Sequence, residues 1–232
     1  MRRVKRQCTA LAMLALAAST FTGHGAGAQT PPGAAEVAAY SGLHKAAHDG
    51  DVAAIRQLLA DGADPDSRNN NGRTPAHVAA FASHEDAVAA LAAGGADANA
   101  LDAELYDMVT IAAVAGDVAM LKAALAAGND PGLTTSRYDG TALIAAAHLG
   151  HAAVVKTVIE AGAPLDHINN LGWTALIEAV ILGDGGPRHQ KTVRHLVEAG
   201  ADQTIPDRQG VTPLGHARSR GYEEIVAILQ GG

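Results

Sequence analysis

Histidine is the residue of this chain best suited to metal binding or acid–base chemistry, and 11 histidines are present among 232 residues. The imidazole is a common metal ligand, and its pKa lies near neutral pH. His189 and His195, with Asp184, are close enough in sequence to approach one another. However, the one cysteine, Cys8, is distant, and no recognised zinc-ligand spacing is present. The sequence therefore predicts no metal site, and a metal-responsive role for residues 183–195 is an alternative.

Motifs for covalent or phosphate chemistry are absent from the sequence. It contains no nucleophile elbow, no phosphate-binding glycine loop and no paired-carboxylate motif. Gly94-Gly95 and Gly185-Gly186 are expected to be turn glycines, with no strand before them. We therefore predict that the chain is not an enzyme and needs no cofactor.

A pattern of about 33 residues recurs six times along the chain. The clearest copy, from Thr141 to Ala163, reads TALIAAAHLGHAAVVKTVIEAGA. A sustained period of this length marks a solenoid, in which each unit buries its apolar face against its neighbours. Equivalent positions in the six copies are His44, His77, Thr110, Ile144, Ile177 and Gly215.

Local physics predicts two short helices in each copy. Thr74-Pro75 is a helix start, because the threonine oxygen caps free N–H groups and proline suits the first helical position. A glycine such as Gly150 ends the first helix, and another such as Gly162 ends the second. Polar turns then lead to the next copy.

These copies resemble the ankyrin repeat, whose signature is D-x-x-G-x-T-P-L-H followed by A-A and later G-A-D. The resemblance covers roughly residues 40–230 and implies an all-α ankyrin-repeat solenoid of about six helix-turn-helix units with finger turns. The third copy departs from it, with Leu105 in place of glycine and Asp107-Met108-Val109-Thr110 in place of T-P-L-H. Its finger turn is the most divergent part. The units are expected near residues 40–69, 70–102, 103–136, 137–168, 169–206 and 207–232.

The resemblance also implies structural roles for several histidines. His44 and His77 occupy the histidine of T-P-L-H, and His84 and His151 stand at the start of second helices. Isoleucine replaces the T-P-L-H histidine in the fourth and fifth copies, so the Thr–His hydrogen bond is not expected there.

Residues 1–28 resemble an export signal. An apolar run, Thr9–Ala18, is followed by Ala26-Gly27-Ala28, which predicts cleavage before Gln29. The protein is therefore expected to be periplasmic or secreted. Residues 29–38 are predicted to be a flexible lead-in to a single domain, 39–232. The basic residues before the apolar run are Arg2, Arg3, Lys5 and Arg6.

Net charge narrows the range of partners. Of the 17 Lys and Arg residues, four lie in the signal, which leaves 13 against 24 acidic residues and a net charge of −11. Such an acidic chain is poorly suited to nucleic acid or anionic membranes. No nucleic acid partner is predicted, and no stable membrane association is predicted after signal cleavage.

Two surface features are predicted to contact a protein partner. One is a row of positions just before the helix-capping residues, which contains residue types common at binding hot spots. Its predicted contacts are Tyr40, Arg73, Tyr106 and Trp173.

The other feature is an insertion of five residues in the fifth unit, within residues 183–190, between the two helices. It is expected to form a loop that presents Asp184, Arg188 and His189. Packing between fingers is the alternative for the aromatic row, and a tolerated surface insertion is the alternative for the loop.

These observations favour an exported, non-enzymatic scaffold that mediates protein–protein interaction through the concave face, the finger row and the fifth-unit loop. The expected partner is another periplasmic protein, with an enzyme among the candidates. The alternative is a periplasmic protein that responds to a metal or small molecule through residues 183–195.

Overall fold

The structure, a computed structural model, describes residues 29–231. The predicted signal at residues 1–28 lies outside the described residues. Within the described range the chain forms 13 α-helices and no β-strand, with one isolated β-bridge between Thr135 and Gly140. No helix in this range has the length and apolar character needed to cross a membrane. The helices are α1 (Ala34–Ala38), α2 (Gly42–Asp49), α3 (Val52–Ala60), α4 (Pro75–Phe81), α5 (Glu85–Ala93), α6 (Met108–Ala115), α7 (Val118–Ala126), α8 (Ala142–Leu149), α9 (Ala152–Glu160), α10 (Ala175–Ile181), α11 (Pro187–Glu198), α12 (Pro213–Arg220) and α13 (Glu223–Leu229).

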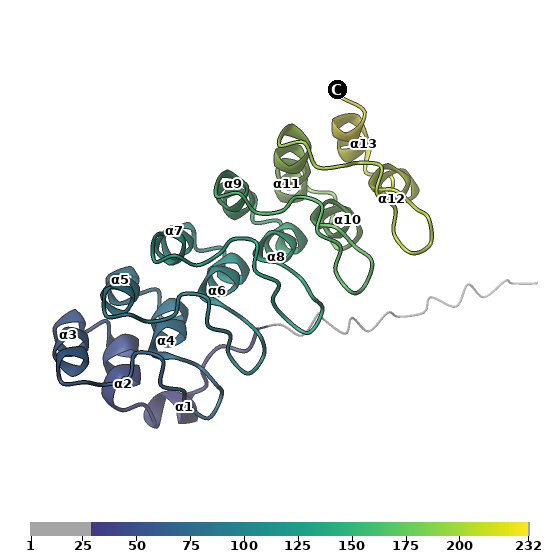
Figure 1. Cartoon of the computed structure of the whole chain (residues 1–232). Helices are drawn as coiled ribbons and strands as arrows, with labels where there is room; N and C mark the ends of the chain where they lie inside the picture. Colours follow the sequence, from purple (N-terminus) through teal and green to yellow (C-terminus); the bar gives the residue numbers. More distant parts are fainter. Residues whose placement is uncertain (1–28, 232) are drawn as a thin grey trace, which may run out of the picture.

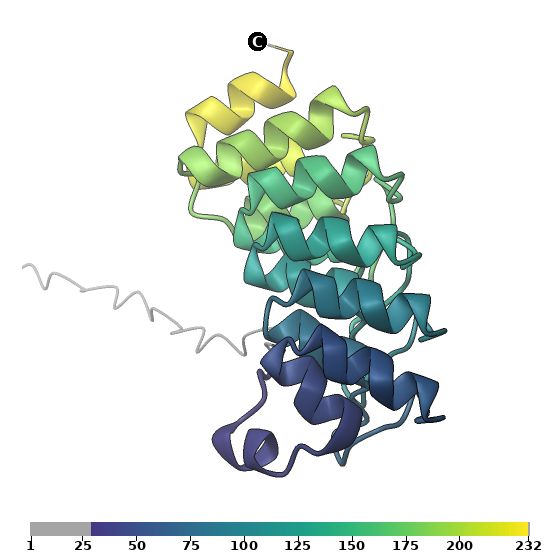
Figure 2. The same ribbon diagram turned by 90° about the vertical axis from the view of Figure 1, so that its left-hand side faces the viewer.

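Twelve of these helices form six pairs that stack side by side (Figure 1). The even-numbered helices α2 to α12 form an inner row, next to the finger loops, and each contacts the next. The odd-numbered helices α3 to α13 form an outer row, seen as successive rungs in Figure 2. The predicted all-α solenoid of six units is therefore confirmed.

The core runs continuously through the stack. Alanines on the inner helices, such as Ala47, Ala113 and Ala147, are fully buried, since small side chains allow helices to approach closely. Larger side chains such as Leu143 and Leu196 fill the space between the inner and outer rows. Each unit thus buries its apolar face mainly against adjacent units.

The predicted capping residues form the hydrogen bonds that their types suggest. The Thr74 and Thr174 side chains accept the backbone N–H groups of His77 and Ile177. His77 also returns a bond, because its Nδ1 accepts the Thr74 N–H at 3.1 Å. At Ile177 only the threonine half of this arrangement is present, which agrees with the expected loss of the Thr–His bond.

The third finger keeps the turn of its neighbours although its sequence departs from theirs. Asp102 Oδ1 accepts the N–H groups of Glu104 and Tyr106 at 2.9 and 3.0 Å. In the fifth unit, Asn169 Oδ1 accepts the N–H groups of Leu171 and Trp173 in the same way. Leu105 adopts φ +64°, where the fingers of the second, fifth and sixth units have glycine and the fourth has Asp139 at φ +52°. This left-handed conformation is unfavourable for leucine, so the turn is formed with local strain.

The segment 29–38 differs from the predicted flexible lead-in. Residues 34–38 form α1, beside α2 at one end of the stack (Figure 1). Glu36 bonds to the side chains of Asn69 and Arg73 in the finger of the second unit, and Gln29 is 8% exposed. The segment is therefore packed against the repeats rather than separate from them.

The insertion in the fifth unit also differs from the predicted loop. The sequence predicts a loop over residues 183–190, but α11 begins at Pro187 and contains 12 residues, against nine in α9. The added residues are therefore divided between a short turn after α10 and an extra helical turn. Proline at the first helical position, preceded by Gly186 as the cap, explains this start.

Candidate protein-binding groove

Three of the four finger-row residues predicted to contact a partner are buried. Tyr40, Arg73 and Tyr106 are 8%, 3% and 9% exposed, whereas Trp173 is partly exposed. Burial leaves Tyr40, Arg73 and Tyr106 little surface for a partner, which favours the packing alternative at these three positions. Trp173 alone among the four stays a predicted contact.

Arg73 is held by groups of the chain itself. Its Nη1 donates to Glu36 Oε2 at 2.8 Å and its Nη2 donates to the Thr30 carbonyl oxygen. Its Nε lies 3.5 Å from Asp102 Oδ2, an ion-pair contact without hydrogen-bond geometry. The guanidinium also lies 4.6 Å from the centre of the Phe81 ring. Arg73 therefore anchors the N-terminal segment to the first fingers.

The Glu36 carboxylate is the other half of this anchor. It accepts hydrogen bonds from Asn69 Nδ2 at 2.8 Å and from the Tyr40 hydroxyl at 3.0 Å. Burial alone would raise the pKa of Glu36, but these hydrogen bonds and the charge of Arg73 bring it below its usual value. Burial and the neighbouring Glu36 raise the pKa of Tyr40 to about 12. The cluster is thus built for an ionised Glu36 and a neutral Tyr40.

His189 is buried, which corrects the prediction that the insertion presents it to a partner. It is 5% exposed; Nε2 donates to the His148 carbonyl at 3.0 Å and Nδ1 contacts Asp184 Oδ1 at 2.9 Å. His84 and His151 make the same type of bond. Each contacts a carbonyl near the end of the inner helix of the unit before, that of His48 in α2 for His84 and that of Val114 in α6 for His151.

Once the insertion is allowed for, the sequence spacing of His189 indicates this structural role. His84 and His151 each follow the inner-helix reference positions, His77 and Ile144, by seven residues, and the insertion adds five more before His189. Asp184 and Arg188 remain exposed and are still predicted contacts. The Gly186 N–H and His189 lower the pKa of Asp184.

The structure does not support a metal site in the described part of the chain, because the candidate ligands do not cluster there. No group of three or more His, Cys, Asp or Glu side chains converges between residues 29 and 231. His195 faces Glu198 at 3.8 Å, while His189 pairs with Asp184. The three residues considered for zinc therefore do not form one cluster.

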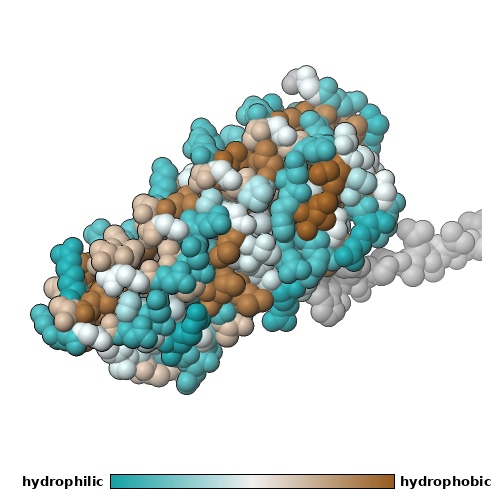
Figure 3. Space-filling view, viewed as in Figure 1, coloured by the Kyte–Doolittle hydropathy of each residue, from teal (hydrophilic) through white to brown (hydrophobic). Residues whose placement is uncertain are grey.

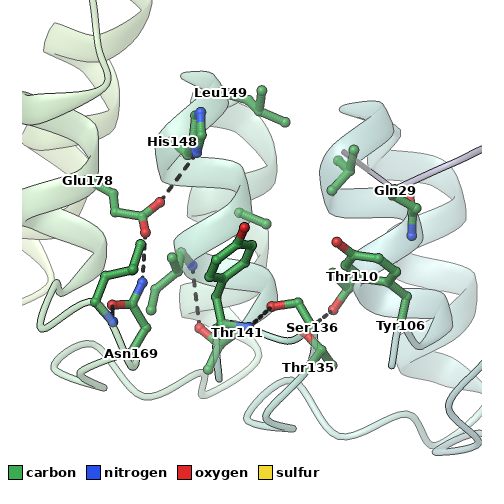
Figure 4. Close-up of a pocket in the computed structure, with 16 residues that line it drawn as sticks. Gln29, Tyr106, Thr110, Thr135, Ser136, Thr141, His148, Leu149, Asn169 and Glu178 are labelled. Atoms are coloured by element: carbon green, nitrogen blue, oxygen red, sulfur yellow. Dashed lines mark hydrogen bonds and ion pairs between the residues drawn. The ribbon is translucent and has the colours of Figure 1, made fainter. Parts of the chain in front are cut away.

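A cavity of about 250 Å³ lies in the groove between the inner helices and the fingers. Its helical walls come from α6, α8 and α10, and its floor from finger residues 135–140 and 169–171 (Figure 4). Apolar groups dominate the lining, including Val114, Ile144 and Leu171. The cavity therefore offers a partner a mainly apolar surface beside the inner helices.

Polar groups mark the two ends of the cavity. At one end, Glu178 on α10 accepts from Asn169 Nδ2 at 2.8 Å and lies 3.4 Å from His148 Nδ1. At the other end, Gln29 lies beside Tyr106 and Thr110 (Figure 4). Its Nε2 is buried without a hydrogen-bond partner. Neither Glu178 nor Gln29 was identified from the sequence, because the fold brings them together from distant segments.

Outside the groove, the exposed large apolar side chains of residues 29–231 are scattered. Exposed large apolar side chains are few, and they are spread over the two fingers of Leu105 and Ile168 and the end of α10 at Leu182. Figure 3 shows apolar patches separated by hydrophilic side chains on the face it presents. Scattered single apolar residues are ordinary for a protein surface. The groove is therefore the better candidate site.

The chain belongs to the ankyrin repeat family. A family model described as ankyrin repeats (three copies) matches residues 6–102 and 109–207. Members of this family generally mediate protein–protein interactions.

Similar proteins include bacterial ankyrin repeat proteins. The chain is 35% identical over 185 residues to the ankyrin repeat protein YahD of Escherichia coli (strain K12), a match that covers 79% of this chain and 92% of YahD. It superposes on an ankyrin repeat domain from Acinetobacter baumannii AYE with a TM-score of 0.77 and 42% identity, over 82% of this chain and 96% of that domain. The ankyrin repeat domain of Bcl-3, a member of the IkappaB family, gives a TM-score of 0.75 at 26% identity, over 83% and 86% of the two chains.

Proposed function

We propose that this ankyrin repeat protein is an exported, non-enzymatic scaffold that binds another exported protein through the groove between its inner helices and fingers. The observation that supports it most is the apolar cavity framed by α6, α8 and α10. Rigid, stacked helices present such a surface with little ordering cost when a partner binds. Trp173, Asp184 and Arg188 are proposed as additional contacts, and an enzyme is one candidate class of partner.

Export is proposed from the sequence of residues 1–28. A basic start, a ten-residue apolar run and a small-residue cleavage site form the pattern of a secretory signal. N-terminal sequencing of the protein recovered from a bacterial periplasmic extract tests this directly. A first residue of Gln29 is expected, and recovery of only uncleaved chain in the cytoplasm would contradict it.

Site-specific photo-crosslinking in the source bacterium tests the groove. A benzoylphenylalanine at Leu171, which lines the cavity, is expected to capture a defined protein. The same group at Ala153, exposed on the outer helix α9, is the matched control and is expected not to capture it. Equal capture at both positions, or capture only at Ala153, would place binding outside the groove.

The metal- or ligand-responsive alternative has no specific observation in its favour. Both ring nitrogens of His189 are engaged by groups of the chain itself. A stability shift on adding a metal, abolished by His189→Ala, would be required to revive it.

A further inference from the structure

Glu178 is the one buried carboxylate in its row of the inner helices. The fourth residue after the helix cap is Val78, Ile111 or Ala145 in units two to four, and Lys45 or His216 in units one and six. In the fifth unit it is a glutamate that is 5% exposed. Burying a carboxylate is costly unless other groups compensate for the water it loses. The buried carboxylate of Glu178, which follows three apolar residues in this row, therefore requires an explanation.

The internal partners of Glu178 leave one of its oxygens weakly engaged. Oε1 accepts a hydrogen bond from Asn169 at 2.8 Å, which is a normal length. Oε2 has a longer contact, 3.4 Å, with His148 Nδ1, and the carboxylate lines the cavity (Figure 4). Charge-assisted hydrogen bonds to carboxylates are about 2.7–2.9 Å long. A cationic donor in the cavity would therefore bind Oε2 better than His148 does.

The walls of the cavity suit the stem of a long basic side chain. Ile144, Leu149 and Leu171 are apolar, and Tyr138 adds an aromatic ring to the lining. Lysine and arginine pack their methylene stems on such surfaces while the charged end reaches a polar group. Pockets for drug-sized molecules hold about 300–1,000 Å³. At about 250 Å³, this cavity lies just below that range and is large enough for one long side chain.

The opposite end of the cavity offers a hydrogen-bond donor. Gln29 is 8% exposed and its buried Nε2 has no partner. A buried donor without a partner is unfavourable, so a group that supplies an acceptor gains by binding there. A backbone carbonyl beside the inserted side chain would provide that acceptor. The net charge of −11 on residues 29–232 also favours a basic partner.

We infer that the cavity takes an arginine or lysine side chain from an extended segment of the protein partner, with the cation on Glu178 Oε2 and a backbone carbonyl on Gln29 Nε2. This inference rests on the proposed function, because it assumes that the partner enters the groove. It adds the chemical character of the partner: a basic residue between small or apolar neighbours.

Peptide display tests this chemistry without knowledge of the partner. The full-length protein is expressed, purified and immobilised. Random 12-residue peptides are then selected for binding to it. Selected peptides are expected to share one basic residue at a fixed position. Replacing that residue with glutamine, or replacing Glu178 with glutamine, is expected to weaken binding by about tenfold or more. The two changes together are expected to cost little more than either alone, which identifies a direct pair.

The matched control is Glu160→Gln. It removes the same charge from the outer helix α9, where the Glu160 side chain is 63% exposed. This variant is expected to bind the peptides within about twofold of the unmodified chain, since single surface charges contribute little. Thermal unfolding of all variants confirms that each is folded.

The outcomes separate this inference from the proposed function. If peptides compete with the partner captured at Leu171 but need no basic residue, or bind Glu178→Gln equally well, the inference fails and the groove scaffold stands. If no peptide binds and no partner is captured at Leu171, both fail.

Discussion

Two fingers of this protein contain the same asparagine turn but use it differently. In the first, Asn69 Oδ1 accepts the N–H groups of Asn71 and Arg73, and Nδ2 donates to Glu36. In the other, Asn169 Oδ1 accepts the N–H groups of Leu171 and Trp173, and Nδ2 donates to Glu178. Both Nδ2 bonds are 2.8 Å long.

The difference lies in where each glutamate comes from. Glu36 belongs to α1, outside the repeats, so the bond joins the N-terminal segment to the finger of the second unit. Glu178 belongs to the inner helix α10, so the bond leaves its carboxylate at the edge of a cavity. One local motif therefore ties the N-terminal segment to the first units, here called the closed end, and holds a carboxylate beside the cavity at the fourth and fifth units, here called the available end.

The largest effect is expected from Arg73→Ala at the closed end. This change leaves Glu36 and Asp102 without their cation, and removing one partner of a buried ion pair typically costs about 3–5 kcal/mol. Urea unfolding measures the loss. Arg56→Ala, an exposed change on α3, is the control and is expected to stay within about 0.5 kcal/mol of the original chain. A loss below about 1 kcal/mol for Arg73→Ala would show that the anchor is dispensable.

A smaller loss is expected from His189→Ala near the available end. His189 bridges the His148 carbonyl and Asp184, and an unsatisfied buried carbonyl costs about 1–3 kcal/mol. Arg188→Ala, its exposed neighbour, serves as the comparison and should be nearly neutral in unfolding experiments. If the two changes have the same effect, the insertion does not depend on a buried histidine.

Acid is expected to destabilise the protein through His77, at the closed end. Burial lowers the pKa of His77, and the carboxylates of Asp102 and Asp107 offset only part of that shift. The unfolded chain therefore binds a proton more readily, and stability present above pH 6.5 is lost as the pH falls towards the folded-state pKa. The limit is about 1.4 kcal/mol per pH unit for one proton. Ile177 occupies the equivalent position at the available end and does not titrate.

Urea unfolding between pH 7 and pH 5.5 measures this slope. Burial also lowers the pKa of His151, so some slope will remain in any His77 variant. His77→Ile, which copies the residue found in the fourth and fifth units, is expected to reduce the slope. An unchanged slope would exclude His77 as a source of acid sensitivity.

The smallest effect is expected at the third finger, between the two ends. Leu105 is 46% exposed and has φ +64°, so glycine would relieve strain while removing little packing. Left-handed backbone costs a non-glycine residue about 1–2 kcal/mol, and the extra flexibility of unfolded glycine cancels part of the gain. Leu105→Gly is therefore expected to add about 0.5–1 kcal/mol. A loss of stability would mean that the leucine side chain contributes packing here.

The repeats could be predicted because their determinants are local. Capping threonines, terminal glycines and the 33-residue spacing act within one unit or between neighbours, so His44 and His77 were correctly expected to be structural. His44 Nε2 donates to the Arg73 carbonyl at 2.9 Å, and His77 Nε2 to that of Tyr106 at 3.0 Å.

The candidate site could be predicted only in part because its contacts are non-local. Gln29 and Glu178 are far apart in sequence and line the same cavity only because the fold places their segments at its two ends. Arg73 looked like a surface contact because nothing in its own repeat reveals Glu36, which lies 37 residues earlier. The insertion places His189 twelve residues after Ile177 instead of seven, so its equivalence to His84 and His151 is not apparent from the spacing of the repeats.

The most direct test of an open, negatively charged cavity is the rate at which a cysteine placed inside it reacts. Cys8 is the one cysteine of the chain, so Cys8→Ser with Ala145→Cys gives one thiol in the cavity lining. Positively charged methanethiosulfonate is expected to react faster than the negatively charged reagent. Glu178→Gln is expected to reduce that rate ratio about threefold or more, while the control Ala153→Cys should show no such change. An unreactive thiol in the Ala145→Cys variant, or a ratio unaffected by Glu178→Gln, would contradict an open cavity whose charge comes from Glu178.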